Sequence, residues 1–189
     1  HLVDRLVQEG HEVVVVDNLS TGKRRNLNRA ARFCKLDIQS WRLERVFRNE
    51  RPNLVMHLAA QMDVRKSVED PVFDAQVNVL GTLNVLQQAV RHGVRKVVFS
   101  SSGGAIYGEQ EIYPAPESHV TRPLSPYGLS KLCGEQYLSY YQRMSGLQIV
   151  SLRYANVYGP RQDPDGEAGV VAIFIQKLLN NEQAIVNGN

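Results

Sequence analysis

Tyr127 and Lys131 are the residues whose types and spacing indicate chemistry most directly, within the segment Ser125–Lys131 (SPYGLSK). Positions four apart on a helix share a face, so we expect the phenol and the ammonium to lie close together. An ammonium beside a phenol favours the phenolate, which lets the tyrosine lose its proton more easily. Such a tyrosine can take a proton from a sugar or alcohol hydroxyl while a hydride leaves the adjoining carbon. The spacing also occurs by chance on solvated helices, so its meaning depends on the surrounding sequence.

The elements that must position this pair alternate between helix and strand along the chain. Apolar periodicity with glycine and proline boundaries predicts helices at 1–9, 40–48, 74–92, 125–145 and 170–180. Short apolar runs predict strands at 13–16, 32–36, 54–58, 97–100 and 149–153. Residues 184–186 lead into a hairpin-type turn signal at Asn187-Gly188, and the long connection 113–126 is expected to be an ordered loop near the site.

This alternation predicts an α/β fold with a Rossmann-type, doubly wound parallel sheet that binds its ligands beyond the carboxyl ends of the strands. The β-branched run Val13–Val16 and the run 97–100 are expected to be buried on both faces of the sheet. The long helix 74–92 is expected to bury one apolar side, formed by Val77, Leu80, Val85, Leu86 and Ala89.

Composition limits the class of protein. The chain has 189 residues, 43% hydrophobic and 22% charged, and a formal net charge of +3. These values are ordinary for one globular domain, without the basic surface that nucleic acid requires. No apolar run approaches the ~20 residues of a membrane span. Cys34 and Cys133 form no metal-ligand spacing, and two free thiols favour a reducing, cytoplasmic setting.

Polar residues follow the first predicted strand. A carboxylate at Asp17, with Asn18 next to it, can accept hydrogen bonds from the adenosine ribose of a dinucleotide. Its charge would repel a 2′-phosphate, which favours NAD over NADP. A turn or capping role is the alternative for Asp17, and the basic run Lys23–Arg25 is either solvated or a 2′-phosphate site.

Further candidates follow the later strands. Small residues in Leu58–Gln61 would let a cofactor approach the backbone, or would serve as packing spacers, while His57 is expected in a core or supporting position. Ser102, in a Ser/Gly run, can donate to and accept from a reacting oxygen, or it belongs to an ordinary turn after the strand. Asn78 is mildly unfavourable inside a helix, which indicates a structural or functional hydrogen bond.

Six motifs, in this order, resemble those of the extended short-chain dehydrogenases/reductases, in their NAD-dependent epimerase/dehydratase group, and most closely the UDP-glucose 4-epimerases of that group. They span nearly the whole chain and are Val16–Gly22 (VDNLSTG), His57–Gln61 (HLAAQ), Asn78–Thr82 (NVLGT), Ser101–Gly108 (SSGGAIYG), Ser125–Lys131 (SPYGLSK) and Leu152–Arg161 (LRYANVYGPR).

The resemblance implies a role for each matching residue. Tyr127 would be the general base, Lys131 its partner that also holds the nicotinamide ribose, and Ser102 the serine that shares the substrate O4 proton. One additional residue before Tyr107 leaves Ser101 as the alternative serine. The implied cofactor contacts are Asp17, Asn18, Asp37, Ile38, Leu58, Ala59, Ala60, Gln61, Asn78, Tyr127, Lys131 and Tyr154. The implied substrate contacts are Ser102, Tyr127 and Asn156, and no metal is implied.

The implied activity is NAD-dependent epimerisation at C4 of a UDP-hexose through a transient 4-keto sugar, with NAD as a bound prosthetic group. Gly103-Gly104 replaces the acidic residues of the group's dehydratases, which argues against loss of water. The alternatives are another nucleotide-sugar epimerase or reductase, such as a UDP-glucuronate 4-epimerase, a non-catalytic NAD-binding protein, or an inactive fragment.

The resemblance also implies a partial dinucleotide-binding domain over 1–189, with a substrate-binding region that starts near residue 157. We expect the family's Gly-rich loop and first strand before His1, and the remaining substrate domain after Asn189. Strands 13–16 and 97–100 would then face the position of that first strand, and this stretch alone would bind NAD poorly. Helices 74–92 and 127–145 are expected to form the interface of a homodimer in the full-length protein.

Overall fold

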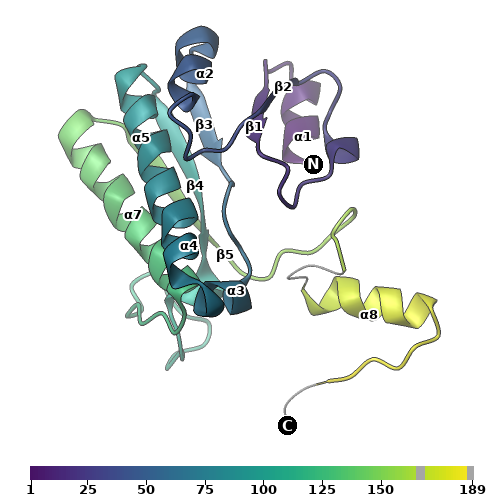
Figure 1. Ribbon diagram of the computed structural model, residues 1–189. Coiled ribbons are helices and arrows are strands. Elements are labelled where there is room, and N and C mark those ends of the chain that lie inside the picture. The colour runs from purple at the N-terminus through teal and green to yellow at the C-terminus, as the bar shows by residue number, and fades with distance from the viewer. Residues whose placement is uncertain (165–168, 187–189) are drawn as a thin grey trace.

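The strands of the protein form two parallel sheets, shown in the computed structural model (Figure 1). The structure describes residues 1–164 and 169–186. One sheet pairs β1 (Val14–Asp17) with β2 (Arg32–Lys35). In the other, β4 (Lys96–Ser102) lies between β3 (Leu54–His57) and β5 (Gln148–Tyr154). Every one of these pairings is parallel, which confirms the predicted α/β class.

Helices connect these strands, and the helix Pro126–Ser145 packs on β4 and β5. The helices are α1 (Leu2–Gln8), α2 (Leu43–Glu50), α3 (Val64–Glu69), α4 (Pro71–Ala75), α5 (Gly81–Arg91), α6 (Gly103–Ile106), α7 (Pro126–Ser145) and α8 (Val170–Leu179). The sequence predicts α1, α2, α5, α7 and α8, but not the short helices α3 and α6 or the 3₁₀ turn Arg24–Asn26.

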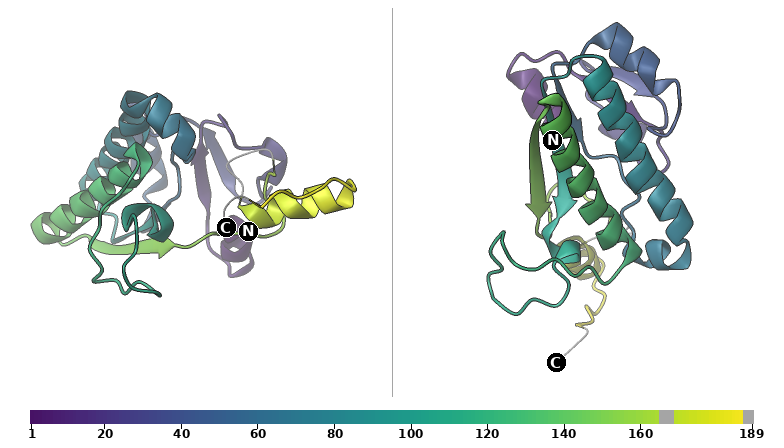
Figure 2. Two further views of the ribbon diagram at one scale, coloured as in Figure 1. Left: turned by 90° about the horizontal axis from the view of Figure 1, so that it is seen from below. Right: turned by 90° about the vertical axis from the view of Figure 1, so that its left-hand side faces the viewer.

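The core lies between the three-stranded sheet and the long helices α5 and α7, which lie side by side along it (Figures 1 and 2). Its fully buried side chains come from all of these elements. They include Leu86 and Ala89 of α5, Val97 and Phe99 of β4, and Leu138 of α7. Burial of these apolar groups orients α7, and α7 carries the Tyr127–Lys131 pair.

The sequence-based prediction of which strands lie at a sheet edge is wrong for β4. The sequence predicts that β4 faces the position of a missing strand, yet it is paired on both sides, and β3 and β5 each pair with β4 alone. β1 also pairs on one side only, with β2. For this reason Val14–Asp17 is half-buried along its whole length, where the sequence predicts full burial.

The helix predicted from Asp74 to His92 has a different start and a break. It begins at Pro71, and a π-helical turn occupies Gln76–Leu80 before α5. A π turn adds one residue to the helix and rotates the positions that precede it relative to those that follow. Leu80 is therefore 57% exposed, although the apolar pattern predicts its burial.

Residues after β5 cross to the amino-terminal half of the molecule (Figure 1). Arg161 Nη2 donates to Asp4 Oδ2 at 2.6 Å, and Lys23 forms an ion pair with Asp163. Helix α8 buries none of its side chains. The predicted turn at Asn187-Gly188 lies outside the described residues.

Candidate active site

Tyr127 and Lys131 lie on one face of α7, as the sequence predicts. The helix starts at Pro126, and Ser125 caps it by accepting a hydrogen bond from Gly128 N at 3.1 Å. The Nζ atom of Lys131 lies 5.7 Å from the centre of the Tyr127 ring. The capped first turn thus fixes where the phenol sits, and the ammonium follows one turn later.

Lys131 is buried at the carboxyl end of β4. Only 4% of the residue is exposed, and Nζ donates to the Ser100 carbonyl oxygen at 2.9 Å. The ammonium also lies 5.1 Å from the centre of the Phe99 ring. Burial lowers the pKa of Lys131 from 10.5 to about 8, and the charge of Asp74 acts in the opposite direction. The lysine is therefore mostly protonated at neutral pH.

Two glycines allow α7 to approach β4 and α6 closely. A Cβ atom on Gly128 would lie 2.4 Å from the carbonyl oxygen of Ala105, and one on Gly134 would lie 2.8 Å from Phe99 Cζ. Any larger residue would push the helix away from the sheet. Gly128 and Gly134 thus determine how close Tyr127 and Lys131 lie to the sheet.

Ser101 and Ser102 have different surroundings at the end of β4. Ser101 is 4% exposed and its hydroxyl donates to Glu135 Oε1 at 2.5 Å. Glu135 also accepts from Arg153, and this contact raises the pKa of Arg153 above its ordinary value. Ser102 is half-buried and its hydroxyl accepts from Ala105 N at 3.3 Å, so the hydroxyl proton is not used in that contact. The hydroxyl proton of Ser101 is therefore used, whereas that of Ser102 is not used in its contact with Ala105.

His57 is a supporting residue, as expected. Its Nε2 atom is 2.9 Å from Thr82 Oγ1, and that hydroxyl donates to the Asn78 carbonyl oxygen at 2.6 Å. Because the single hydroxyl proton of Thr82 is used, His57 Nε2 must carry a proton and donate it. Burial, assisted by the charge of Lys131, lowers the pKa of His57 to about 3. His57 is neutral and fixed in one tautomer.

The loop Leu58–Gln61 combines exposed and anchored residues. Leu58 and Ala59 are exposed, while Gln61 is buried and held at its backbone by Asn78. The Asn78 side chain accepts from Gln61 N at 2.9 Å and donates to Gln61 O at 2.8 Å. Both amide protons of Asn78 are used, since the other goes to Asp74. Its hydrogen bonds therefore hold the Leu58–Gln61 loop to the helix that carries Asn78.

Asp17, Asn18 and Asp37 gather where β1 and β2 end. Asn18 Nδ2 donates to Asp37 Oδ2 at 2.8 Å, and Asp17 Oδ1 accepts from Leu19 N at 2.6 Å. Burial would raise the pKa of Asp37, but hydrogen bonds from Gln39 and Asn18 outweigh it and lower the pKa. Leu19 adopts a left-handed φ of 59°, a conformation that costs energy and that clusters at functional sites.

The remaining candidates lie near these groups. Ile38 is buried, its side chain is close to Gly81, and its carbonyl oxygen accepts from Asn84 at 2.6 Å. Tyr154 ends β5 in register with Ser102, and Tyr154 and Asn156 are exposed. The predicted residues therefore form two groups at the carboxyl ends of the strands, one on β1–β2 and one on β3–β4–β5 with α7.

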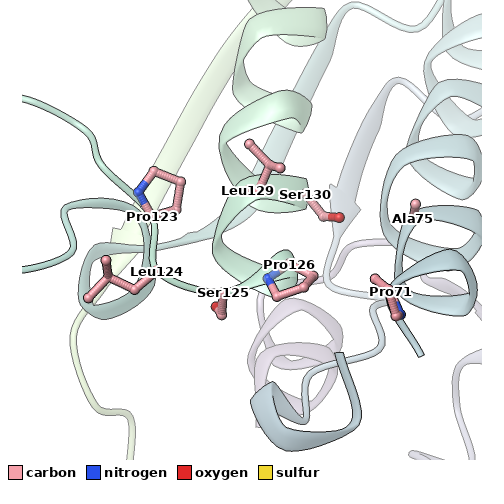
Figure 3. A pocket seen from close by; sticks show the side chains of 8 residues that line it. All are labelled: Pro71, Ala75, Pro123, Leu124, Ser125, Pro126, Leu129 and Ser130. Carbon is pink, nitrogen blue, oxygen red and sulfur yellow. The ribbon is translucent and has the colours of Figure 1, made fainter. Parts of the chain in front are cut away.

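A hollow of about 370 Å³ lies beside the first turn of α7 (Figure 3). Its lining comes from α4, α7 and the segment before α7, and includes Pro71, Ala75, Leu124 and Leu129. Neither Tyr127 nor Lys131 lines it. The hollow is thus distinct from the site that the strand ends form.

Several residues that support the site are not predicted from the sequence. Asp74 and Ser130 are buried and bonded to one another, and Glu135 and Arg153 hold Ser101. A polar residue at every fourth position, Asp74, Asn78 and Thr82, is the pattern in the sequence that indicates a buried polar stripe on this helix.

Within the described ranges, 1–164 and 169–186, the structure contains no group of three or more His, Cys, Asp or Glu residues arranged to hold a metal ion. No helix in the described part of the chain is both long enough and apolar enough to cross a membrane.

The parallel α/β sheet and the tyrosine–lysine pair at its carboxyl edge are typical of short-chain dehydrogenases/reductases. The chain belongs to the NAD dependent epimerase/dehydratase family, whose family model matches residues 1–189. A putative UDP-glucose 4-epimerase from Methanocaldococcus jannaschii is 48% identical over 189 residues. A UDP-glucose 4-epimerase from Mycolicibacterium smegmatis is 46% identical over 193 residues. In both cases the whole chain aligns and spans 62% of the relative's length.

Two solved structures share the fold closely. The UDP-glucose 4-epimerase of Thermotoga maritima, solved with UDP-glucose, is 49% identical with a TM-score of 0.98, and the match covers 100% of this chain and 62% of that one. The UDP-glucose 4-epimerase of Thermus thermophilus, solved with NAD, is 52% identical with a TM-score of 0.93 and coverages of 97% and 60%. These similarities confirm the resemblance predicted from the six motifs.

Proposed function

We propose that the protein is a UDP-hexose 4-epimerase that interconverts UDP-glucose and UDP-galactose with a bound NAD. The observation that carries this proposal is the Tyr127–Lys131 pair, held 5.7 Å apart between ring centre and Nζ at the end of β4. Relatives and solved structures at 46–52% identity that bear the name UDP-glucose 4-epimerase support it. Because the chain spans 62% of the relatives' length, the activity is proposed for the full-length protein.

Tyr127 would act as the general base that removes the proton from the sugar O4 and later returns it. Lys131 would stabilise the phenolate through its ammonium and hold the nicotinamide ribose. We assign the second hydroxyl at O4 to Ser102, because Ser101 already donates to Glu135. Asn156, exposed just after β5, would contact the sugar nucleotide. The chain thereby orients the sugar and moves its proton.

The residues at the strand ends fit a dinucleotide. Asp17 and Asp37 place acceptors at the carboxyl ends of β1 and β2, where ribose hydroxyls need them, and their charge suits NAD better than NADP. Leu58, Ala59 and Tyr154 leave exposed surface beside the second group of residues. When bound, NAD would supply the hydride chemistry at C4 of the sugar. Ile38, Ala60, Gln61 and Asn78 would line or hold this surface.

Three further assignments belong to the same proposal. The region from about residue 157 would begin the substrate-binding part of the protein. A homodimer would bury the exposed apolar residues of α7 and the π turn, among them Leu80, Leu129 and Met144, which are 57%, 59% and 68% exposed. A cytoplasmic setting agrees with the free thiols of Cys34 and Cys133.

The test is conversion of UDP-galactose to UDP-glucose by the full-length protein and by its Tyr127→Phe variant. We expect turnover in the first and a loss of roughly 10²-fold or more in the second, because the base is removed. Tyr140→Phe, an exposed tyrosine on the same helix, is the matched control and should keep its activity. Turnover by Tyr127→Phe at the wild-type rate contradicts the proposal. Parallel assays with UDP-glucuronate distinguish the nearest alternative.

A further inference from the structure

Asp74 is a buried carboxylate that the roles proposed above do not use. It is 0% exposed and accepts three hydrogen bonds. The donors are Gln61 Nε2 at 3.1 Å, Asn78 Nδ2 at 2.8 Å and Ser130 Oγ at 2.6 Å. All three donors are neutral, and among the described residues no Lys, Arg or His nitrogen lies within 4.0 Å of this carboxylate. A buried charge without a directly bonded cation is costly unless other interactions compensate it.

The three donors belong to the elements that surround the candidate site. Gln61 ends the loop after β3, Asn78 lies in the π turn, and Ser130 precedes Lys131 on α7. The network extends from Asn78 through Thr82 to His57, and every member is buried. The Asp74 carboxylate therefore connects α7, which carries Tyr127 and Lys131, to the Leu58–Gln61 loop.

Lys131 directly follows Ser130, the residue that donates to Asp74 at 2.6 Å, and its ammonium is buried as the carboxylate is. Lys131 is buried beside the aromatic rings of Phe99 and Tyr127, and the nearby His57, whose own pKa the lysine lowers, is neutral. The negative charge of Asp74 raises the proton affinity of Lys131 and opposes the larger effect of burial. In a low-dielectric interior such coupling persists beyond hydrogen-bond distance.

We propose that Asp74 is a positioning residue that supplies the negative charge balancing the Lys131 ammonium, and that fixes α7 to the Leu58–Gln61 loop through Ser130 and Gln61. The inference deepens the proposed function and rests on it, because Lys131 is the partner of the proposed base. In this proposal Asp74, which lies outside the motif Ser125–Lys131, keeps Lys131 protonated.

The test is a titration of lysine Cε signals by NMR in the full-length protein, with Lys131 assigned by its absence in Lys131→Met. Asp74→Asn keeps the shape of the side chain and removes its charge. We expect it to lower the pKa of Lys131 by about one unit. Asp70→Asn, an exposed carboxylate four residues earlier, is the matched control and should leave the Lys131 titration unchanged. Lys131 titrating at the wild-type pH in folded Asp74→Asn overturns the proposal.

Ser130→Ala separates charge from geometry, because it removes one hydrogen bond of Asp74 and no charge. We expect Lys131 to titrate close to the wild-type pH in this variant. If Ser130→Ala lowers the pKa of Lys131 as much as Asp74→Asn does, then the hydrogen bond between Ser130 and Asp74, and not the charge of Asp74, determines that pKa. The proposal then fails.

A second variant covers the case in which Asp74→Asn does not fold. Asp74→Ser is smaller and likewise removes the charge, and we expect it too to lower the pKa of Lys131. Lys96→Met, at the opposite end of β4, is the control for the assignment of the lysine signals. Lys131 titrating at the wild-type pH in folded Asp74→Ser overturns the proposal. These titrations need no turnover, so they succeed or fail independently of the proposed epimerase activity.

Discussion

The ammonium of Lys131 lies 5.7 Å from the centre of the Tyr127 ring, one helical turn further along α7. The ammonium donates to a main-chain oxygen of β4, the Ser100 carbonyl at 2.9 Å. The position of the lysine is therefore set by the strand, and that of the tyrosine by the capped start of the helix. Their relationship depends on how closely α7 packs on β4.

The burial of Lys131 predicts a specific dependence of stability on pH. The pKa of Lys131 is about 8 in the folded protein, against 10.5 for an unperturbed lysine. The unfolded state therefore binds more protons between these values, and this group's contribution to stability rises as the pH increases through that window. Below about pH 8 the ammonium is buried at full cost.

Lys131→Met removes this contribution. The quantity to measure by urea denaturation is the difference in free energy of unfolding, wild type minus Lys131→Met. We expect this difference to increase between about pH 7 and about pH 10. Lys96→Met, which removes a less buried lysine from the other end of β4, serves as the control. A difference between wild type and Lys131→Met that stays constant over this range would show that the lysine is not buried as described.

The sequence predicts the face that carries Tyr127 and Lys131, because two positions four apart on a helix share a face whatever the rest of the fold does. It also predicts which strand ends carry Asp17 and Ser102. It does not predict Asp74, since a carboxylate near a helix start is usually a solvated cap and only the tertiary contacts to Ser130 and Gln61 show otherwise. The sequence does not predict the π turn either. An apolar pattern with 3.6 residues per turn gives no sign that one extra residue is inserted in the helix.

Ser101 and Ser102 should respond differently to removal of the hydroxyl. Ser102→Ala is expected to lower kcat roughly tenfold or more, because the O4 proton loses a partner, while Ser102→Thr keeps a hydroxyl and should retain most of the activity. Ser101→Ala should leave kcat near wild type and reduce the free energy of unfolding by roughly 1.5–3 kcal/mol, the typical contribution of a hydrogen bond to a charged group such as Glu135. Steady-state kinetics and urea denaturation check both. If Ser101→Ala instead lost activity at unchanged stability, Ser101 would be the catalytic serine.

Asp17 should determine the choice between NAD and NADP. Asp17→Asn keeps an oxygen for the hydrogen bond from Leu19 N and removes the charge that repels a 2′-phosphate. We expect the ratio of the NADP to the NAD dissociation constant to fall, measured by calorimetry on the cofactor-free full-length protein. Glu12→Gln, an exposed carboxylate before β1, is a control that should leave the ratio unchanged. An unchanged ratio in Asp17→Asn would assign Asp17 to the turn alone.

The sheet edges show what strand spacing leaves undetermined. Alternating strands and helices predict a parallel sheet, but they do not state the order in which the strands lie. The prediction that 97–100 faces an empty position is wrong for this reason, since β4 is central in its sheet and β3 is at the edge. The order depends on contacts between elements far apart in the sequence, such as those of α7 with β4 and β5.

Gly128 and Gly104 offer a matched test of how closely α7 must pack. Both lie in helices, but a Cβ atom on Gly128 would be 2.4 Å from the Ala105 carbonyl oxygen, whereas one on Gly104 would meet no atom within 4 Å. Gly128→Ala is expected to lower both the melting temperature and the activity. The added methyl group would force α6 and the first turn of α7 apart, and this turn carries Tyr127. Gly104→Ala should leave the melting temperature unchanged or raise it, since alanine is the better helix former by about 1 kcal/mol. If both variants melted at the wild-type temperature, the close contact between α6 and α7 would not be a feature of the folded protein.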